Sequence, residues 1–142
     1  MTARPNAAWP TRPDGTRLAG IAYGAKILPV RVLGHCGGYD SDINDAIIWA
    51  AGGHVDGVPD NTHPAQVINL SLGGAGACSA TDPQALAVAQ ANALGAVVVV
   101  SAGNSNADAA GYSPASCPGV ITVASTGITS KRAFYSNYGT SV

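Results

Sequence analysis

The sequence predicts an α/β protein in three layers, with a mostly parallel sheet flanked by helices. Three observations predict this class. Strand-like and helix-like segments alternate along the chain, which is typical of β-α-β units with right-handed crossovers. The segment Ala96–Val100 contains four consecutive valines and is too short for a helix, so it predicts a strand buried on both faces. Glycine-rich turns separate the segments, as expected of a tightly packed domain.

Four segments have the apolar, β-branched composition of strands. They are Lys26–Leu33, Gln66–Leu72, Ala96–Val100 and Val120–Ala124. Pro29 favours an edge position for the first of them, because proline cannot donate to a ladder of hydrogen bonds. Residues 132–138 have weaker strand character. Residues 1–17 hold three prolines and a Pro-Asp-Gly turn signal, so they predict an irregular leader, and we expect the domain to span residues 18–142.

Two helices are expected between the strands. The first spans residues 42–51, with Ser41 or Asp40 as its cap. Its apolar residues recur at the spacing of one helix face: Ile43, Ile47, Ile48 and Ala51. The second spans residues 82–94, because proline is favoured in the first turn and a glycine follows the last residue. Turn-forming residues predict a loop over residues 105–119.

Composition and charge exclude several classes of partner. Eight acidic and seven basic residues give a net charge of −1, which provides no basic field for nucleic acid or an anionic membrane. The longest apolar run is far too short to span a membrane. The N-terminal residues lack the apolar core of a signal peptide, so the chain by itself is expected to carry no export signal.

Asn104 is the first candidate functional residue. It ends the sequence Ser-Ala-Gly-Asn, which directly follows the valine-rich strand. Ligands of open parallel sheets bind beyond the carboxyl ends of the strands, where a side-chain amide is placed to donate a hydrogen bond. The alternative is a plain turn residue, because Gly-Asn is common at bends.

Two further motifs predict no site. Residues 74–76 (Gly-Ala-Gly) lie between a strand and a helix, as in dinucleotide-binding turns, but Ser79 replaces the third glycine and the next strand ends without an acidic residue. We therefore expect no nucleotide cofactor. His35, His54 and His63 have no metal-ligand spacing, so we interpret them as solvated loop residues and expect no metal site.

Four blocks of the sequence, in this order, resemble the subtilisin-like serine proteases (subtilases, peptidase family S8). They are Gly20–Leu33, Val67–Gly74, Ser101–Asn104 and Tyr135–Gly139. The Cys-Gly-Gly loop at residues 36–38 is similar to that of secreted bacterial members. The resemblance covers residues 18–142 and implies a subtilisin-like fold that is incomplete, as in a central fragment of the protease domain.

The resemblance implies a serine endopeptidase that cleaves extended peptides through an acyl-enzyme. It implies that Asn104 donates a hydrogen bond in the oxyanion hole, to charge that develops only in the transition state. The substrate would add as a strand between two edges. The residues implied to bind substrate are Ser71, Leu72 and Gly73 on one side, Gly37, Gly38 and Tyr39 on the other, and Ala102 and Gly103 as walls of the pocket for the residue before the cut.

The motifs of the catalytic triad are absent from this sequence. In the family, the catalytic aspartate and the histidine of His-Gly-Thr-His precede the first block, and the serine of Gly-Thr-Ser-Met-Ala follows the last. Ser141 lies in a similar Gly-Thr-Ser, but a different family block precedes it and no triad histidine is present to activate it. We therefore expect the chain to be inactive alone and its partners to be an extended peptide and the missing remainder of the domain. The alternative function is a non-catalytic peptide-binding module.

The remaining expectations also come from the resemblance. Three cysteines are an odd number, so at least one has no partner within the chain. The similarity to secreted bacterial members implies an extracellular parent enzyme, and in related secreted enzymes cysteines of this kind are oxidised. A bond between Cys36 and Cys78 is expected, with Cys117 bonded to a residue outside this sequence. Calcium sites are common in the family, but no carboxylate cluster here predicts one.

Overall fold

The computed structural model describes residue 22 and residues 24–142. The chain divides into two units, residues 1–30 and 31–142, and the assigned helices and strands all lie in the second. The expected leader and the expected domain start at residue 18 lie outside the described residues. The strand predicted at Lys26–Leu33 is wrong, because this segment has irregular backbone. A strand needs a hydrogen-bonded neighbour, and the sheets of the described part of the chain contain no strand from this segment.

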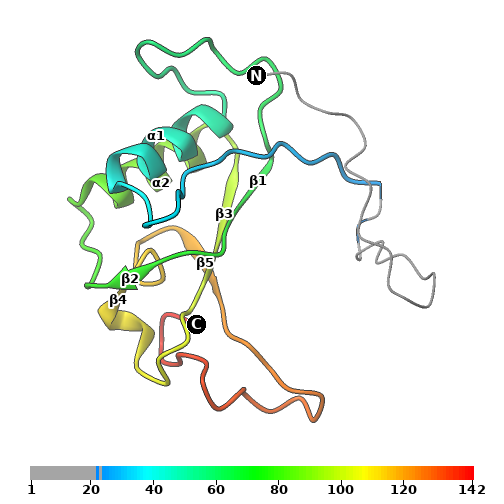
Figure 1. The fold of residues 1–142 in the computed structure, drawn as a ribbon, viewed down its shortest axis with the longest axis vertical. Helices are drawn as coiled ribbons and strands as arrows, with labels where there is room; N and C mark the ends of the chain where they lie inside the picture. Colours follow the sequence, from blue (N-terminus) through cyan, green and yellow to red (C-terminus); the bar gives the residue numbers. More distant parts are fainter. Residues whose placement is uncertain (1–21, 23) are drawn as a thin grey trace. The chain divides into compact units, whose positions relative to one another are not determined.

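Three strands form a parallel sheet with β3 in the centre (Figure 1). They are β1 (Val67–Leu70), β3 (Val97–Ser101) and β5 (Val120–Val123), in the order β1-β3-β5. Leu70 pairs with Val100, and Val100 pairs with Thr122. The parallel sheet predicted from the alternating pattern is therefore confirmed.

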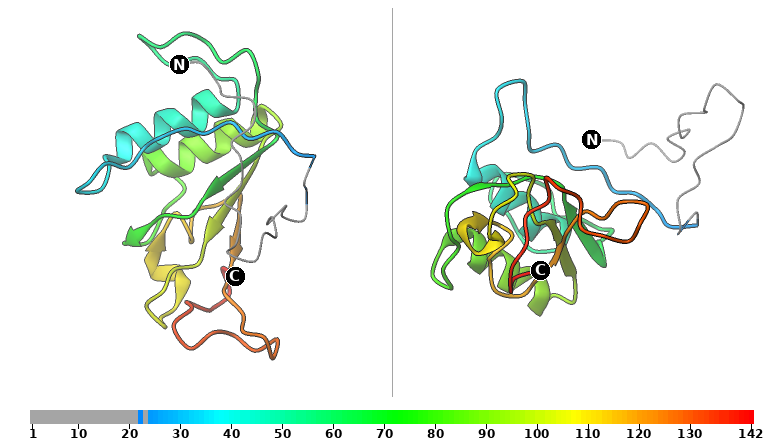
Figure 2. Two further views of the ribbon diagram at one scale, coloured as in Figure 1. Left: turned by 45° about the vertical axis from the view of Figure 1, so that its right-hand side comes forward. Right: turned by 90° about the horizontal axis from the view of Figure 1, so that it is seen from below.

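Both described helices lie on the same face of this sheet (Figures 1 and 2). They are α1 (Asp40–Ala50) and α2 (Pro83–Ala93), and each has a proline or acidic residues in its first turn. Ile47 of α1, Val88 of α2 and Val98 of β3 are at most 1% exposed and belong to one apolar core. Flanking helices are thus confirmed.

The predicted cap of α1 is wrong. The N-cap residue is Tyr39, which makes no side-chain capping bond. The helix begins at Asp40, so Asp40 and Ser41 fall inside its first turn rather than before it. There Asp40 and Asp42 interact favourably with the partial positive charge of the helix N-terminus, which replaces part of what a cap supplies.

The central strand is buried on one face, not on both as predicted. Val98 and Val100 are 0% and 1% exposed beneath the helices, whereas Val97 is 42% exposed on the opposite face. The neighbouring strands repeat this alternation, with Val67 61%, Ile121 54% and Val123 51% exposed. The cause is that the described helices supply only one of the two outer layers of the predicted three. Within residues 31–142, this second apolar face of the sheet is left uncovered.

A small ribbon continues from the end of β1. It pairs β2 (Gly74–Ala75) with β4 (Tyr112–Ser113) in antiparallel register, and the short 3-10 helix η1 (Ala109–Gly111) precedes β4. Residues 105–119, predicted as a plain loop, therefore contain two short elements. Ala102, Ala109 and Ala115 form a second small core beneath them. Residues 132–138 form no strand.

The expected Cys36–Cys78 disulfide is wrong. Cys78 is bonded to Cys117, 39 residues further along the chain, and Cys36 is exposed and free among the described residues. A turn follows β4, in which the N–H of Ser116 donates to the carbonyl oxygen of Tyr112 and the N–H of Cys117 to that of Pro114. The backbone N–H of Cys78 donates to Oγ of Ser116 in this turn at 2.9 Å, which places the two bonded cysteines together. The bond therefore closes the segment that contains α2 and β3.

Removing this disulfide should destabilise the chain strongly. A loop of this length predicts a loss of about 2–4 kcal/mol in the free energy of unfolding for the double variant Cys78→Ala/Cys117→Ala, measured by urea denaturation. Cys36→Ala is the matched control and should leave the midpoint unchanged. The opposite pattern, with only Cys36→Ala destabilising, would contradict the assigned pairing.

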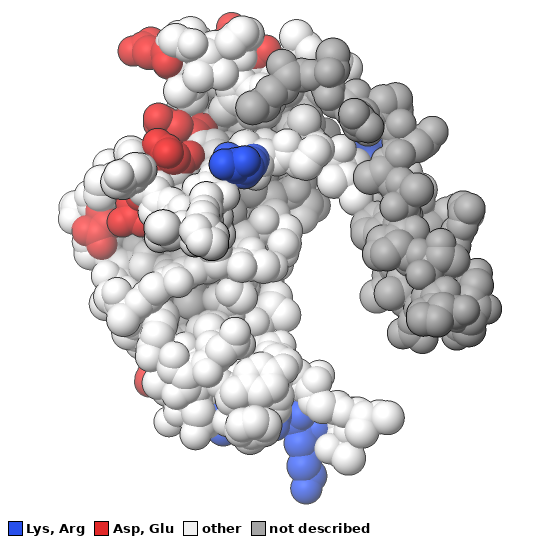
Figure 3. Space-filling view, viewed as in Figure 1, with Lys and Arg blue, Asp and Glu red and all other residues white. Residues whose placement is uncertain are grey.

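The loop after α1 carries an exposed histidine between two carboxylates. Acidic side chains gather at α1 and in this loop, while most of the face seen in Figure 3 is uncharged. Nδ1 of His54 lies 2.7 Å from Asp60, and its Nε2 lies 3.3 Å from Asp56. The hydrogen bond and charge of Asp60 are the main causes that raise the pKa of His54 above 6.5, with a smaller contribution from Asp56.

NMR titration should therefore show that Asp60→Asn lowers the pKa of His54 toward 6.5, and Asp56→Asn should lower it less. Because the pKa is raised in the folded state, the stabilisation is fully present below the unfolded pKa and is lost as pH rises through the folded pKa. Equal shifts in the two variants would contradict the dominant role of Asp60.

Candidate functional site at the carboxyl edge of the sheet

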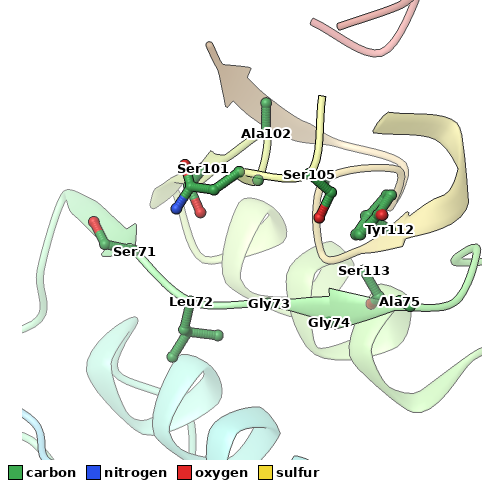
Figure 4. A pocket seen from close by; sticks show the side chains of 13 residues that line it. Ser71, Leu72, Gly73, Gly74, Ala75, Ser101, Ala102, Ser105, Tyr112 and Ser113 are labelled. Atoms are coloured by element: carbon green, nitrogen blue, oxygen red, sulfur yellow. The ribbon is translucent and has the colours of Figure 1, made fainter. Parts of the chain in front are cut away.

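The candidate site begins where β1 and β3 end. Because the two strands are parallel neighbours in register, Ser71 and Ala102 leave the sheet at the same edge. Chain that follows these ends runs along the two sides of one hollow (Figure 4). The structure thus brings together two of the three segments that the sequence singled out, residues 71–73 and 102–104.

The hollow between these segments is called pocket 1 and has a volume of about 490 Å³. Its walls consist mostly of backbone and small side chains. They are Ser71–Ala75, Ser101–Ser105, Tyr112, Ser113 and Ala115. A methyl group on Gly73 would lie 2.7 Å from the carbonyl oxygen of Ser113, so glycine is required for this close approach.

A second hollow, pocket 2, lies on the other side of residues 71–75 and measures about 870 Å³. Its opposite wall comes from the loop before α1 and from the start of that helix, and includes Gly37, Gly38, Ile43 and Asn44. Tyr39, which the sequence also singled out, does not line either pocket and is 78% exposed. Residues 71–75 therefore border both hollows.

The backbone of Ser71–Gly73 is unpaired. Among the backbone hydrogen bonds of the described residues, none uses an N–H or C=O group of these three residues. Figure 4 shows the side chain of Leu72 turned away from the opposite wall of pocket 1, and it packs against the main core. An anchored strand edge with free backbone groups can pair with an extended peptide.

Asn104 lines pocket 1 with an exposed, uncommitted side chain. No hydrogen bond among the described residues involves its amide. Gly103, just before it, has a φ of +104°, a conformation that glycine adopts without strain. The amide is therefore available to donate into the pocket.

Asn44 is a pocket residue that sequence reasoning missed. It is 9% exposed, it lines pocket 2, and its buried Oδ1 has no hydrogen-bond partner among the described residues. The signal was a polar residue three positions before Ile47, within the apolar stripe of the helix. An unpaired buried acceptor costs free energy.

Replacing this side chain with an apolar one of similar size should stabilise the chain. We expect Asn44→Leu to raise the free energy of unfolding by about 1 kcal/mol, because it removes an unsatisfied acceptor and adds apolar contacts. Asn61→Leu is the control, since Nδ2 of Asn61 donates to the carbonyl oxygens of Trp49 and Ala50, and it should destabilise. Urea unfolding measures both, and a destabilised Asn44→Leu would contradict the assignment of an unpaired oxygen.

The described residues that line the two pockets include no histidine. His35, His54, His63 and Ser141 line neither of them. In the described part of the chain, no group of three or more His, Cys, Asp or Glu residues could hold a metal ion. Within the same residues, no helix has the length and apolar character needed to cross a membrane.

These features define a parallel α/β domain whose candidate site lies at the carboxyl edge of its sheet. The model of the subtilase family (peptidase S8) matches residues 4–142. The chain therefore belongs to the subtilase family, as the four sequence blocks predicted.

Similar proteins are extracellular bacterial proteases. The chain is 54% identical to an extracellular basic protease of Dichelobacter nodosus, over 91% of this chain and 21% of that protein. It is also 54% identical to an extracellular protease of Xanthomonas campestris, over 89% of this chain and 22% of that protein. A solved protease structure from Pseudoalteromonas arctica superposes with a TM-score of 0.84 and 54% identity, covering 87% of this chain and 36% of that one. The chain thus spans about a fifth of these curated relatives and about a third of the solved structure.

Proposed function

We propose that this chain is the substrate-binding and oxyanion-binding part of a secreted serine endopeptidase. One observation carries the proposal: the unpaired backbone of Ser71–Gly73 and Asn104, whose amide makes no hydrogen bond among the described residues, line the same pocket. A protease needs both features side by side, because one holds the peptide and the other stabilises the transition state. Family membership supports the reaction class.

The peptide would bind as an added strand along Ser71–Gly73. Its backbone would pair with this edge, while Gly37 and Gly38 line the facing wall of pocket 2. A side chain just before the scissile bond would enter pocket 1, between Ala102–Gly103 and residues 71–73. Backbone pairing gives affinity for any sequence, and the two pockets give selectivity.

Asn104 would act on the transition state rather than on the bound substrate. When a nucleophile attacks the peptide carbonyl, the oxygen gains negative charge, and an amide N–H directed at that oxygen stabilises it. Because the charge exists only in the tetrahedral state, this hydrogen bond accelerates the reaction without tightening substrate binding. Its exposed amide, free of other hydrogen bonds among the described residues, suits this role.

Nucleophile, base and acid would come from the remainder of the protease domain. The uncovered apolar face of the β1-β3-β5 sheet supports this, because a folded domain buries such a face. Its exposed residues are Val67, Val97, Ile121 and Val123. The share of the relatives' length that the chain spans agrees with a domain continued in further chain. We infer an extracellular location from the same relatives.

Labelling with a fluorophosphonate probe tests where the nucleophile lies. The chain alone should give no serine adduct, whereas the longer protein that contains it should be labelled at a serine outside residues 1–142. Mass spectrometry of the digested adduct makes the distinction. An adduct mapped to Ser141 would contradict the proposed division of roles.

Kinetics of the longer protein test the role of Asn104. Asn104→Ala should lower kcat by about 10²–10³-fold with little change in KM, the loss known for removal of the corresponding donor in a subtilisin. Ser105 lines the same pocket, so Ser105→Ala is the matched control. Its kcat is expected to be close to that of the unmodified enzyme. A similar loss in both variants would show that Asn104 has no special role.

A non-catalytic peptide-binding module is the second candidate function. Two peptide edges at pockets whose described lining includes no histidine favour it. Titration of the chain with an extended peptide separates the two: saturable binding without turnover, in a chain with no longer parent, supports the module. Absence of binding leaves the protease fragment as the better account.

A further inference from the structure

Asn137 is a buried polar residue to which the proposed function gives no task. It is 0% exposed, and it lies in the Tyr135–Gly139 block that the sequence singled out without a chemical role. A buried amide is costly unless it is hydrogen-bonded. The partners of this amide therefore indicate what it stabilises.

Every partner of Asn137 in the 102–107 segment is a backbone group close to Asn104. Its Nδ2 donates to the carbonyl oxygen of Ala102 at 2.9 Å. Its Oδ1 accepts from the N–H groups of Ser105 at 2.8 Å and Ala107 at 3.2 Å. Its own backbone N–H donates to the carbonyl oxygen of Gly103 at 2.9 Å. One residue thus binds the chain on both sides of Asn104 and leaves the side chain of Asn104 free.

Gly103 fits tightly against the same amide. A methyl group at Gly103 would lie 2.5 Å from Nδ2 of Asn137, and its φ of +104° disfavours any other residue. The turn before Asn104 is therefore shaped around the amide of Asn137. A displacement of one is expected to displace the other.

Neighbouring residues hold Asn137 in place. Oγ of Ser136, itself 1% exposed, accepts from the N–H of Ser125 at 2.9 Å and donates to the carbonyl oxygen of Asn137 at 3.0 Å. The guanidinium of Arg132 donates to the carbonyl oxygen of Ser136 and lies 4.8 Å from the ring centre of Tyr138. The amide therefore has a fixed position from which to order the 102–107 loop.

We propose that Asn137 is a positioning residue that sets the direction of the Asn104 amide in the oxyanion hole. The inference rests on the proposed function of Asn104. An oxyanion donor works only when it is preorganised at the place where charge develops, so that no reorganisation is needed during the reaction. The three side-chain hydrogen bonds of Asn137 supply that preorganisation from behind the pocket.

A double-mutant cycle in the longer protease tests this proposal. Asn137→Asp keeps the shape and the two acceptor bonds but loses the donor to Ala102, and should lower kcat about 10- to 100-fold with KM changed less than about threefold. In an Asn104→Ala background the same change should cost less than about threefold, because the donor that it positions is already gone. Additive losses would overturn the proposal, since a general structural defect would act equally in both backgrounds.

A second variant and matched controls guard against a folding defect. Gly103→Ala presses on the same amide and should reproduce the kcat loss and its dependence on Asn104. Asn92 and Gly119 form a similar asparagine–glycine contact elsewhere in the fold. Nδ2 of Asn92 donates to the carbonyl oxygen of Gly119, and a methyl group on Gly119 would lie 2.6 Å from this Nδ2. Asn92 is exposed, unlike Asn137, so Asn92→Asp should destabilise less, and both Asn92→Asp and Gly119→Ala should leave kcat within about threefold. Equal kcat losses in these controls would also overturn the proposal.

The positional claim has a readout in this chain that does not depend on activity. In ¹⁵N-labelled chain, Asn137→Asp should reduce the order parameter of the Asn104 backbone and speed amide exchange at Ser105 and Ala107, with residues of α1 and α2 unchanged. An unchanged Asn104 would overturn the proposal. If the unmodified longer protein fails to cleave peptides, the proposed function fails instead, and the order of Asn104 alone decides the positional claim.

Discussion

The parallel pairing of β3 with both of its neighbours is the constraint on which the site depends. This register sets Leu70 opposite Val100, so β1 and β3 end at nearly the same level of the sheet. The segments that follow the two strands therefore both line pocket 1. A slip of one residue would turn the valine side chains of β3 to the opposite face and bury the wrong set. The core beneath α1 and α2 therefore fixes the geometry of a site that contributes little to the core itself.

The candidate site is built from backbone and small residues, which suits the proposed binding of an extended peptide. Ser71–Gly73 keeps its hydrogen-bonding groups free, and glycine at position 73 lets this edge approach β4. Other residues stabilise the segments around the site. The Cys78–Cys117 disulfide links the chain after β2 to the chain after β4, and the buried amide of Asn137 binds the backbone of Ala102 and Ser105. Rigid support beneath an open edge is what a peptide-binding catalytic site requires.

Much of this fold could be predicted from the sequence because local patterns determine it. The valine run gave β3, Pro83 began α2, and the alternation of segments gave the parallel sheet. Two of the failures have a common cause, since both depend on residues distant in sequence. Lys26–Leu33 has strand composition but no strand partner in the described sheets, and β3 is open on one face because nothing in the described residues covers it.

In the candidate site, too, local patterns could be predicted from the sequence, whereas contacts between distant residues could not. The Ser-Ala-Gly-Asn motif and the resemblance singled out residues 71–73 and 102–104, and the structure brings them to one pocket. Three cysteines allow three pairings, and the turn after β4, which meets the backbone of Cys78, selects Cys78 with Cys117. The proposed role of Asn137 was also hidden, because the sequence does not reveal that this distant residue bonds to the backbone on both sides of Asn104.

The most direct test of the account is a crystal structure of the longer protease with a peptide boronate bound to its catalytic serine. The account predicts that the amide of Asn104 lies about 2.7–3.1 Å from a boronate oxygen, while the peptide backbone pairs with Ser71–Gly73. A boronate stabilised by other donors, with Asn104 turned away and the 71–73 edge unpaired, would contradict it.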